Sequence, residues 1–312
     1  YVDRVADGYR QRGAGAPAEP RTALFGDDPA GMLTSYSAIL PEDGYMGGYS
    51  YSAGFGAGDA WFITPLFDAD SGEPLALLDG ASMNPFKTGA TGAVAVDALA
   101  RGDAETVGLI GSGAQARGQL RATATVRELT AVDVYSPTQA NREAFADEMT
   151  ETLDADVTAV ESSAAAVADA DIVITATTAG EPVFDGEQLA PGTHVTAMGQ
   201  YNPSKRELDT TTVERSTYVP DLRDRATQDA GALLHAIETR VVTESHIHAE
   251  LGDIVAGNAA GRTSDDEITV FDSGGTAIET VAAAGMLYER AREQGLGATI
   301  EFAPASDALT GR

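Results

Sequence analysis

A glycine-rich turn is the feature of the sequence with the clearest chemical meaning. The hydrophobic run at residues 106–110 leads directly into the pattern G-x-G-x-x-A. In such a turn Gly111 permits a tight bend, Gly113 lets backbone N–H groups approach a pyrophosphate, and Ala116 lets the next helix pack closely on the strand. The pattern therefore predicts a dinucleotide site rather than a chance glycine turn. Its residues are Gly111, Ser112, Gly113, Ala114, Gln115 and Ala116.

The end of the second strand in such a fold distinguishes the two nicotinamide cofactors. An acidic residue there binds the ribose 2′-hydroxyl of NAD, but this sequence has Ser136 and Thr138, with Arg142 one turn into the next helix. The two hydroxyls can hydrogen-bond a 2′-phosphate and Arg142 can supply charge. NADP is therefore favoured and NAD is possible. Alternatively, Ser136 and Thr138 merely cap the helix.

The histidines are candidates for a metal site. His246 and His248, with Glu244 and Glu250 beside them, imitate a metal-binding cluster. Their rings would point the same way on a strand, but a helix separates them by about 200°. We expect no metal site. Because the sequence has no cysteine, it also has no disulfide framework, no thiolate zinc site and no cysteine nucleophile.

The charge balance excludes several classes of partner. The 312 residues include 48 Asp and Glu against 20 Lys and Arg, a formal net charge of −28. Such a surface repels phosphate backbones and anionic lipid headgroups, so we expect neither nucleic acid nor membrane as a partner. The only lysines are Lys87 and Lys205. We interpret this combination as adaptation to molar salt, typical of a halophilic archaeal protein; an acidic mesophilic protein would explain the charge but not the lysine count.

The elements that must position the glycine turn fall into zones along the chain. Residues 17–80 hold short strand-like runs with a hairpin turn at 68–74, which predicts an antiparallel sheet. Residues 88–100 are Ala-rich and predict a helix. From 106 to 220, strands and helices alternate as in a doubly wound parallel sheet. The predicted strands are 106–110, 131–135, 157–160, 172–176 and 194–198, and the predicted helices are about 114–127, 138–152 and 162–169. A last helix is predicted at 276–294, ahead of a short tail.

Location is predicted from what the sequence lacks. No run approaches the ~18 apolar residues of a membrane span, and no secretory signal opens the chain. We therefore expect a cytoplasmic protein. The first helical stretch, 1–11, begins at Tyr1 rather than Met, and we expect it to be the remnant of a longer N-terminus.

Four segments together resemble the ornithine cyclodeaminase/mu-crystallin family. They are residues 87–91, the turn at 111–116, the stretch 169–177 and the motif at 268–279. The last motif is far more specific than the glycine turn, and the likeness covers nearly the whole chain. The family includes ornithine cyclodeaminases, archaeal alanine dehydrogenases, ketimine reductases and mu-crystallin.

This resemblance implies an α/β fold in which a Rossmann dinucleotide-binding domain is inserted in an α+β substrate and dimerisation domain. Residues 1–98 would form the substrate and dimerisation domain, and residues 99–270 would form the NAD(P)-binding domain. Residues 271–312 would return as a C-terminal helix to the first domain. A homodimer follows from the same likeness.

The resemblance also assigns site residues. Arg21 matches the arginine that holds the substrate carboxylate, and Met32 falls at the expected distance after it. A second carboxylate-binding arginine is replaced by Lys87, which supplies charge but not a bidentate fork. Ser273 and Gly274 are expected beside the nicotinamide. The other positions assigned to the cofactor are Ala176, Thr177, Met198 and Gly199.

Two departures from ornithine cyclodeaminases bear on the reaction. Tyr49 stands where those enzymes carry a proton-transferring lysine, and Tyr201 stands where an aspartate receives the δ-amino group, so conversion of ornithine to proline is disfavoured. We predict instead that NAD(P)H reduces a ketimine or 2-oxo acid carbon beside a small molecule's carboxylate, as in an imine reductase or amino-acid dehydrogenase. Lys87 and Tyr49 are the predicted catalytic residues, with Tyr49 as general acid, unless it only packs a sheet face. The alternatives are an ornithine cyclodeaminase and a non-catalytic, mu-crystallin-like NADPH-binding protein.

Overall fold

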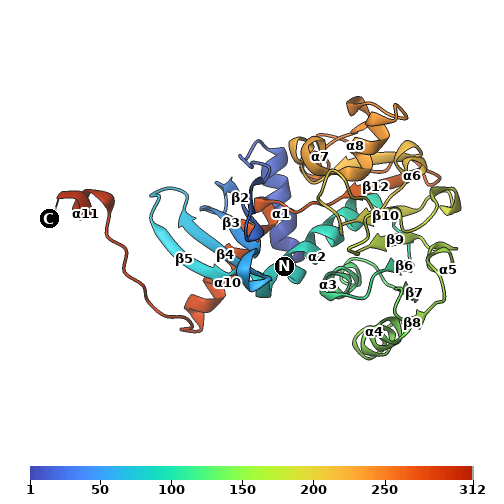
Figure 1. The fold of residues 1–312 in the computed structure, drawn as a ribbon, viewed down its shortest axis with the longest axis horizontal. Coiled ribbons are helices and arrows are strands. Elements are labelled where there is room, and N and C mark those ends of the chain that lie inside the picture. Colours follow the sequence, from blue (N-terminus) through green and yellow to red (C-terminus); the bar gives the residue numbers. More distant parts are fainter. Residues whose placement is uncertain (311–312) are drawn as a thin grey trace.

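The first third of the chain forms an antiparallel sheet of five strands, with sequential neighbours paired throughout. The structure is a computed structural model that describes residues 1–310 (Figure 1). The predicted hairpin turn joins the last two strands. Alternation along the strands places Tyr36, Tyr49 and Leu66 in the core. The strands are β1 (Thr22–Asp27), β2 (Ala30–Leu40), β3 (Tyr45–Gly54), β4 (Asp59–Asp68) and β5 (Pro74–Asp79).

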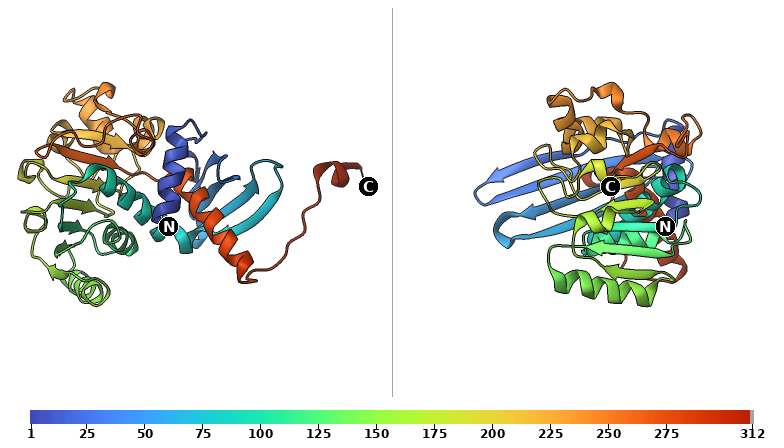
Figure 2. Two further views of the ribbon diagram at one scale, coloured as in Figure 1. Left: turned by 180° about the vertical axis from the view of Figure 1, so that it is seen from behind. Right: turned by 90° about the vertical axis from the view of Figure 1, so that its right-hand side faces the viewer.

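Three helices pack with this sheet. They are α1 (Val2–Gly13), α2 (Gly80–Leu99) and α10 (Ala277–Glu293), and α10 contacts β2, β3 and α1 (Figure 2). The C-terminal helix therefore returns to the sheet formed by the start of the chain. Its N-terminus is fixed by a capping box between Thr276 and Glu279.

Helix α2 begins earlier than the sequence indicated. The prediction placed its start at residue 88, whereas the helix begins at Gly80 and includes Pro85. The carboxylate of Asp79 caps the helix by accepting a hydrogen bond from Ala81 N at 3.0 Å. Proline usually ends a helical pattern, which is why the extra turns were not predicted. These turns carry Asn84 and bring Lys87 into the middle of a helix.

The second sheet has seven parallel strands in the order β11-β12-β10-β9-β6-β7-β8. Strand β6 pairs with both β7 and β9. Successive strands are therefore added on one side of β6 up to β8 and on its other side from β9 onward. Such a reversal of strand order is the switch point where folds of this kind bind ligands. The protein is thus α/β, with a Rossmann unit inserted in an α+β unit, as predicted. The strands are β6 (Thr106–Ile110), β7 (Ala131–Tyr135), β8 (Asp156–Ala159), β9 (Ile172–Thr175), β10 (His194–Ala197), β11 (Ser216–Pro220) and β12 (Ile268–Asp272).

Helices cover this sheet, and several of them were not predicted. The predicted ones are α3 (Ala114–Thr123), α4 (Gln139–Thr152) and α5 (Ser163–Val167). The others are α6 (Thr210–Glu214), α7 (Arg223–Asp229), α8 (Gly231–Glu238) and α9 (Leu251–Val255). They are short, so that few turns of apolar periodicity mark them in the sequence.

The C-terminal segment leaves the body of the molecule. After α10 it runs out beyond the antiparallel sheet to α11 (Ala305–Thr310) (Figures 1 and 2). Leu296, Ile300 and Phe302 on this segment are exposed. Within residues 1–310, no helix is both long enough and apolar enough to cross a membrane.

Candidate active site

A cavity of about 380 Å³ lies between the two units. The carboxyl ends of β6, β9, β10 and β12 lead to it, as expected for a switch-point site. From the antiparallel sheet and α2 it is lined by Arg21, Tyr36, Tyr49, Tyr51, Phe62, Asn84, Lys87 and Thr88. From the parallel-sheet unit it is lined by Gly113, Ala114, Gln115, Ala176, Thr177, Thr178, Met198, Gly199, Tyr201, Ser273, Gly274 and Gly275.

The glycine turn is built to receive a dinucleotide. Gly111 has a φ of +124°, and a Cβ there would lie 2.4 Å from the carbonyl oxygen of Ala176, so only glycine fits. A Cβ on Gly113 would meet nothing within 4 Å, because this position faces open space. Helix α3 begins directly after it, at Ala114, so its N-terminal N–H groups are available to a phosphate. Ala116 is fully buried, as close packing of helix on strand requires.

The ribose end of the site differs from the prediction in one residue. Ser112 Oγ donates to Ser136 Oγ at 3.0 Å, and Thr138 is exposed at the N-cap of α4 without a side-chain capping bond. Arg142, however, is buried; it donates to the backbone oxygen of Ser136 at 3.1 Å and pairs with Glu161 at 3.2 Å. The prediction that Arg142 supplies charge to a 2′-phosphate is therefore not supported by this geometry, because both ends of its guanidinium already have acceptors.

Glu207 is a buried residue that the sequence analysis missed. Its Oε1 accepts a hydrogen bond from Thr177 N at 2.7 Å, and its Oε2 accepts one from Gly199 N at 2.7 Å. It thereby joins the turns after β9 and β10, both of which line the cavity. Burial raises the pKa of Glu207, although these hydrogen bonds lower it. No local pattern around residue 207 could have indicated this role.

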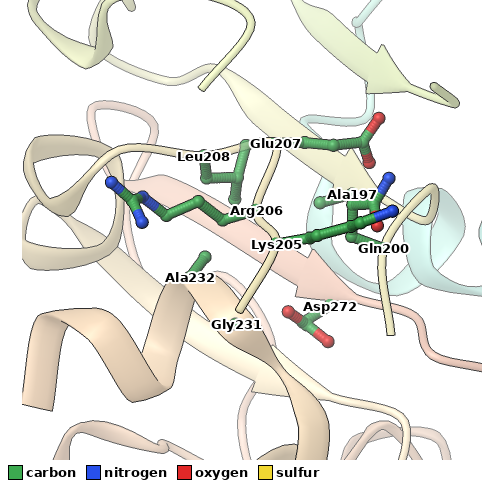
Figure 3. A pocket seen from close by; sticks show the side chains of 9 residues that line it. All are labelled: Ala197, Gln200, Lys205, Arg206, Glu207, Leu208, Gly231, Ala232 and Asp272. Atoms are coloured by element: carbon green, nitrogen blue, oxygen red, sulfur yellow. The ribbon is translucent and has the colours of Figure 1, made fainter. Parts of the chain in front are cut away.

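A second, much smaller pocket adjoins Glu207. It has a volume of about 10 Å³, and its wall includes Lys205, Glu207 and Asp272 (Figure 3). This space is the size of one water molecule. It is too small for a substrate, so the larger cavity is the candidate active site.

Arg21 lines the cavity and is held by contacts with Asp229, with the loop after β12 and with Tyr201. Its Nε is 3.1 Å from the carboxylate of Asp229, and its Nη2 donates to the backbone oxygens of Gly274 and Gly275. The ring of Tyr201 stacks on the guanidinium, with 4.4 Å between the Cζ atom and the ring centroid. Within residues 1–310, Nη1 has no hydrogen-bond acceptor, which leaves it for a ligand carboxylate.

Lys87 is the second cation of the cavity. It is 1 % exposed, and its Nζ lies 3.3 Å from Oε1 of Glu279. The ring of Tyr49 lies 4.8 Å from the same Nζ. Burial lowers the pKa of Lys87, and the charge of Glu279 raises it in part. A lysine with a lowered pKa, beside a cavity, is suited to giving up a proton.

Tyr49 lines the cavity but directs its hydroxyl elsewhere. The hydroxyl donates to the backbone oxygen of Gly80 at 3.1 Å, and the ring packs against those of Tyr36, Tyr51 and Phe62. Burial raises the pKa of Tyr49 above its usual range. The general-acid role predicted for Tyr49 is therefore not supported, because its proton is bound to the backbone; the packing alternative describes it better.

Only some of the other predicted residues line the cavity. Met32 pairs with Phe25 and Ala53 in the antiparallel sheet and does not line the cavity. The prediction that Met32 contacts the substrate is not supported by this position, since Met32 packs against the core instead. Ser273 and Gly274 line the cavity, and their place beside the nicotinamide stays a prediction. His246 and His248 each hydrogen-bond a backbone carbonyl, those of Val213 and Ala260.

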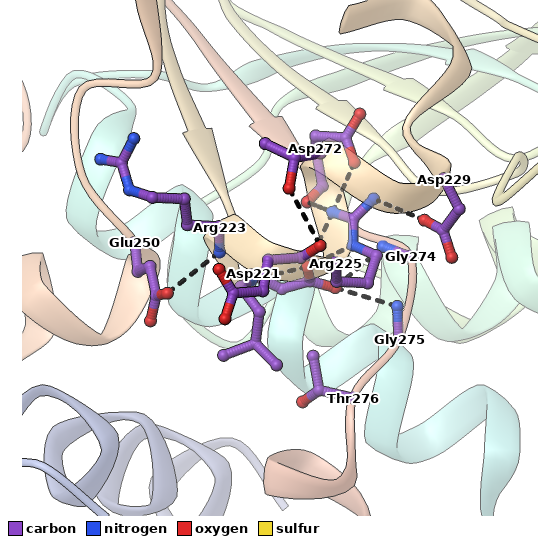
Figure 4. A network of polar contacts seen from close by, with 12 residues as sticks. Asp221, Arg223, Arg225, Asp229, Glu250, Asp272, Gly274, Gly275 and Thr276 are labelled. Atoms are coloured by element: carbon purple, nitrogen blue, oxygen red, sulfur yellow. Dashed lines mark hydrogen bonds and ion pairs between the residues drawn. The ribbon is translucent and has the colours of Figure 1, made fainter. Parts of the chain in front are cut away.

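A buried network around Arg225 supports the loop after β12 (Figure 4). Arg225 is fully buried and pairs with Asp221, Asp229 and Asp272. The backbone N–H groups of Gly274 and Gly275 donate to Asp221, and Asp229 reaches Arg21. This network was not predicted from the sequence, because its signal there, the run of charges at 221–229, is also typical of a solvated helix face.

Comparison with known proteins identifies the family of the chain. The model of the ornithine cyclodeaminase/mu-crystallin family matches residues 9–295. Over 241 residues the chain is 40% identical to a Delta(1)-pyrroline-2-carboxylate reductase of Bacillus cereus, covering 77% of this chain and 74% of that protein.

Solved structures extend the likeness to nearly the whole chain. The Delta(1)-pyrroline-2-carboxylate reductase of Thermococcus litoralis, in complex with NADH and L-proline, has a TM-score of 0.90 at 34% identity, over 96% of this chain and 94% of that chain. An archaeal alanine dehydrogenase, described as a dimer with bound NAD, has a TM-score of 0.90 at 30% identity, over 97% of this chain and 94% of that chain.

Proposed function

Because the chain belongs to the ornithine cyclodeaminase/mu-crystallin family, we propose that it reduces Δ1-pyrroline-2-carboxylate, a cyclic ketimine beside a carboxylate, to proline. The chain is an NAD(P)H-dependent oxidoreductase that acts on a ketimine or 2-oxo acid carbon. The finer assignment to a cyclic ketimine is supported by relatives and structural neighbours that carry this activity in their names.

One observation carries the proposal. The dinucleotide turn and two buried cations, Arg21 and Lys87, line the same cavity. The cations suit a carboxylate, and the glycine turn suits the cofactor. Between them, the wall of the cavity is aromatic, formed by Tyr36, Tyr51 and Phe62 among others, which suits the apolar methylene groups of a small ring.

The chain's own residues would divide the work as follows. Nη1 of Arg21 binds the substrate carboxylate and fixes the orientation of the ring. Lys87 adds positive charge and donates a proton from Nζ to the ring nitrogen, while Glu279 stabilises the ammonium form that Lys87 needs. Bound NAD(P)H supplies the hydride that reaches the C=N carbon, so that one hydride and one proton convert the imine into the amine.

The residues that line this cavity favour the reductase over the two alternative functions. An ornithine cyclodeaminase would need an amine-binding carboxylate where Tyr201 stacks on Arg21 and a lysine where Tyr49 packs among aromatic rings. A protein that binds NADPH without turnover would not need a buried lysine with a lowered pKa. Both features favour the reductase.

We infer further that the protein accepts NADPH, with NADH as a second cofactor. The turn after β7 carries Ser136 and Thr138 and no carboxylate, so nothing in that turn repels a 2′-phosphate. The hydroxyls of Ser112 and Ser136 lie within 3.0 Å of each other and could bind it together. The structural neighbours are described with NAD or NADH, which supports NADH as the second cofactor; the proposal of NADPH rests on the turn after β7 alone.

We also infer a homodimer, formed through the outer face of the antiparallel sheet. This face carries Leu24 and Leu33, which pair in register, and Trp61, which is separated from Leu33 by Ser52. They are 65%, 47% and 67% exposed, and large apolar side chains gathered on one exposed face favour an interaction site. Ile63 and Leu77 extend the patch along β4 and β5.

One assay tests the proposed reaction. NADPH and NADH oxidation is followed with Δ1-pyrroline-2-carboxylate, with pyruvate plus ammonium, and with no substrate, and ammonia release from ornithine is measured in parallel. Fast oxidation with the cyclic imine is expected. Oxidation only with pyruvate and ammonium would make the protein an amino-acid dehydrogenase, and ammonia release from ornithine would make it a cyclodeaminase.

A further inference from the structure

Asp229 joins the substrate arginine to the buried network, and it is the carboxylate least held by hydrogen bonds. Its Oδ2 lies 3.1 Å from Nε of Arg21 but receives no hydrogen bond from the part of the chain that the structure describes. Its Oδ1 accepts only the bond from Nη1 of Arg225, at 3.4 Å. The side chain is nevertheless 6 % exposed, so water compensates little of its charge.

The neighbouring carboxylates are held much more firmly. Asp221 accepts hydrogen bonds from Leu222 N, from Nε of Arg225, and from the N–H groups of the loop after β12, at 2.7 to 2.9 Å. Asp272 accepts a hydrogen bond from the hydroxyl of Tyr218 at 2.5 Å, and its Oδ1, which receives no hydrogen bond from the described residues, lies only 2.6 Å from Nη2 of Arg225, against 3.4 Å for Oδ1 of Asp229 from Nη1. Hydrogen bonds to the charged form keep a carboxylate ionised. Asp229 is therefore the member of the group that most readily takes up a proton.

The net charge of the buried cluster explains why a proton would be taken up when a carboxylate binds. With every group ionised, three cations face four carboxylates, so the cluster carries one net negative charge. A substrate carboxylate beside Arg21 would add a second one, and uncompensated buried charge is costly. The charged groups are Arg21, Lys87 and Arg225 on one side, and Asp221, Asp229, Asp272 and Glu279 on the other.

We propose that Asp229 takes up one proton from solvent when the substrate carboxylate binds to Arg21, and thereby sets how substrate affinity depends on pH. The inference rests on the proposed function, because it needs a carboxylate ligand at Arg21. In the free enzyme, ionised Asp229 holds Arg21 through its Nε edge. In the complex, neutral Asp229 leaves the charge of Arg21 to the ligand. Asp229 is a positioning residue, since it acts on the substrate through Arg21.

The surroundings of Asp229 fix the sign of the pH dependence. Burial raises the pKa of Asp229 to about 6, although the two arginines lower it, and a bound carboxylate raises it further. The affinity for a carboxylate is therefore highest below that pKa and falls as the pH rises from it to the pKa of the complex. The titratable and charged groups that face Asp229 and Arg21 come from both units: Tyr36 on β2, Tyr51 on β3, Tyr201 after β10, Asp221 after β11, Arg225 on α7 and Asp272 on β12.

Calorimetry tests this coupling directly. Pyrrole-2-carboxylate, whose ring nitrogen does not titrate near neutral pH, is titrated into the enzyme saturated with NADH, in buffers that differ in ionisation enthalpy. Wild-type protein should take up protons on binding, and its affinity should fall by up to about tenfold per pH unit above pH 6. Asp229→Asn should bind without proton uptake and with little pH dependence. Asp224→Asn, on the exposed side of the same helix, is the matched control and should behave as wild type.

The experiment distinguishes failure of the proposed function from failure of the role proposed for Asp229. If wild-type protein binds neither pyrrole-2-carboxylate nor L-proline, the proposed function is overturned. Binding without proton uptake, or equal uptake in Asp229→Asn, overturns the role of Asp229 alone. If circular dichroism shows that Asp229→Asn does not fold, infrared difference spectra of the wild-type protein replace the variant. Ligand binding should convert a carboxylate band into the C=O band of a protonated carboxyl group. An unchanged carboxyl region would contradict the proposal.

Discussion

Nζ of Lys87 lies 3.3 Å from Oε1 of Glu279, and each side chain is 1 % exposed. The pair joins α2 to α10 across 192 positions of the sequence. Burying a lone ammonium would be costly, so Lys87 depends on this carboxylate to stay protonated beside the cavity. Burial still lowers the pKa of Lys87. A cation that is held in place and can also release a proton is what an imine reductase needs.

Substitution of Lys87 should separate its two roles. Lys87→Gln removes both the charge and the proton and is expected to lower kcat/KM by about 10²- to 10⁴-fold. Lys87→Arg keeps the charge but cannot release a proton, so we expect KM to change little while kcat falls. Steady-state kinetics at several pH values measure both. A full kcat in Lys87→Arg would restrict Lys87 to carboxylate binding.

Tyr49→Phe should leave catalysis nearly intact. The hydroxyl donates to Gly80, so its removal is expected to cost about 1 kcal/mol of stability, the usual contribution of one such hydrogen bond, with little change in kcat. Denaturant unfolding and steady-state turnover check the two parts. A loss of about 10²-fold in kcat, typical of a missing general acid, would return the catalytic role to Tyr49.

Cofactor preference should respond to a carboxylate after β7. Ser136→Asp places an acceptor where the ribose 2′-hydroxyl of NADH is bound in this fold and repels a 2′-phosphate. We expect the ratio of kcat/KM for NADPH to that for NADH to fall by about tenfold or more. Ser136→Ala is the control that removes the hydroxyl without adding charge. An unchanged ratio in Ser136→Asp would mean that the 2′ position lies elsewhere.

The oligomeric state should depend on the outer face of the antiparallel sheet. Trp61 is 67% exposed on that face, and Trp61→Asp should shift the protein from dimer to monomer in sedimentation velocity, because a buried unpaired charge opposes association. Val241→Asp, at a partly exposed apolar position of the other unit, should leave the dimer intact. A wild-type protein that sediments as a monomer would contradict the interface.

Salt should stabilise the protein strongly. With a net charge of −28, self-repulsion is expected to weaken as the Debye length falls from about 30 Å at 0.01 M to about 3 Å at 1 M. We therefore expect the Tm to rise steeply with KCl over that range. Differential scanning fluorimetry measures it, with an acidic mesophilic protein as reference. A Tm that is insensitive to KCl would contradict the halophilic interpretation.

Much of the parallel-sheet unit could be predicted from the sequence. The strands at 106–110 and 131–135 and the turn from Gly111 to Ala116 lie where they were expected, because alternation, glycine position and helix starts are local properties. The start of α2 and the short helices after residue 205 were not predicted. At the start of α2, capping by Asp79 outweighs the unfavourable effect of Pro85 inside the helix. The short helices after residue 205 are stabilised by tertiary packing, which leaves no periodic pattern in the sequence.

The amino-acid sequence is enough to identify the dinucleotide turn, the cations Arg21 and Lys87 that resemble a carboxylate site, and the tyrosines that stand in place of cyclodeaminase groups. What each of these side chains contacts depends on the tertiary structure. It placed Lys87 beside Glu279, turned the Tyr49 hydroxyl to Gly80, enclosed Arg142 and connected Arg21 to Asp229. The reason is physical: the pKa and reach of a buried group depend on its desolvation and on partners that are distant in sequence and meet only when the two units pack together.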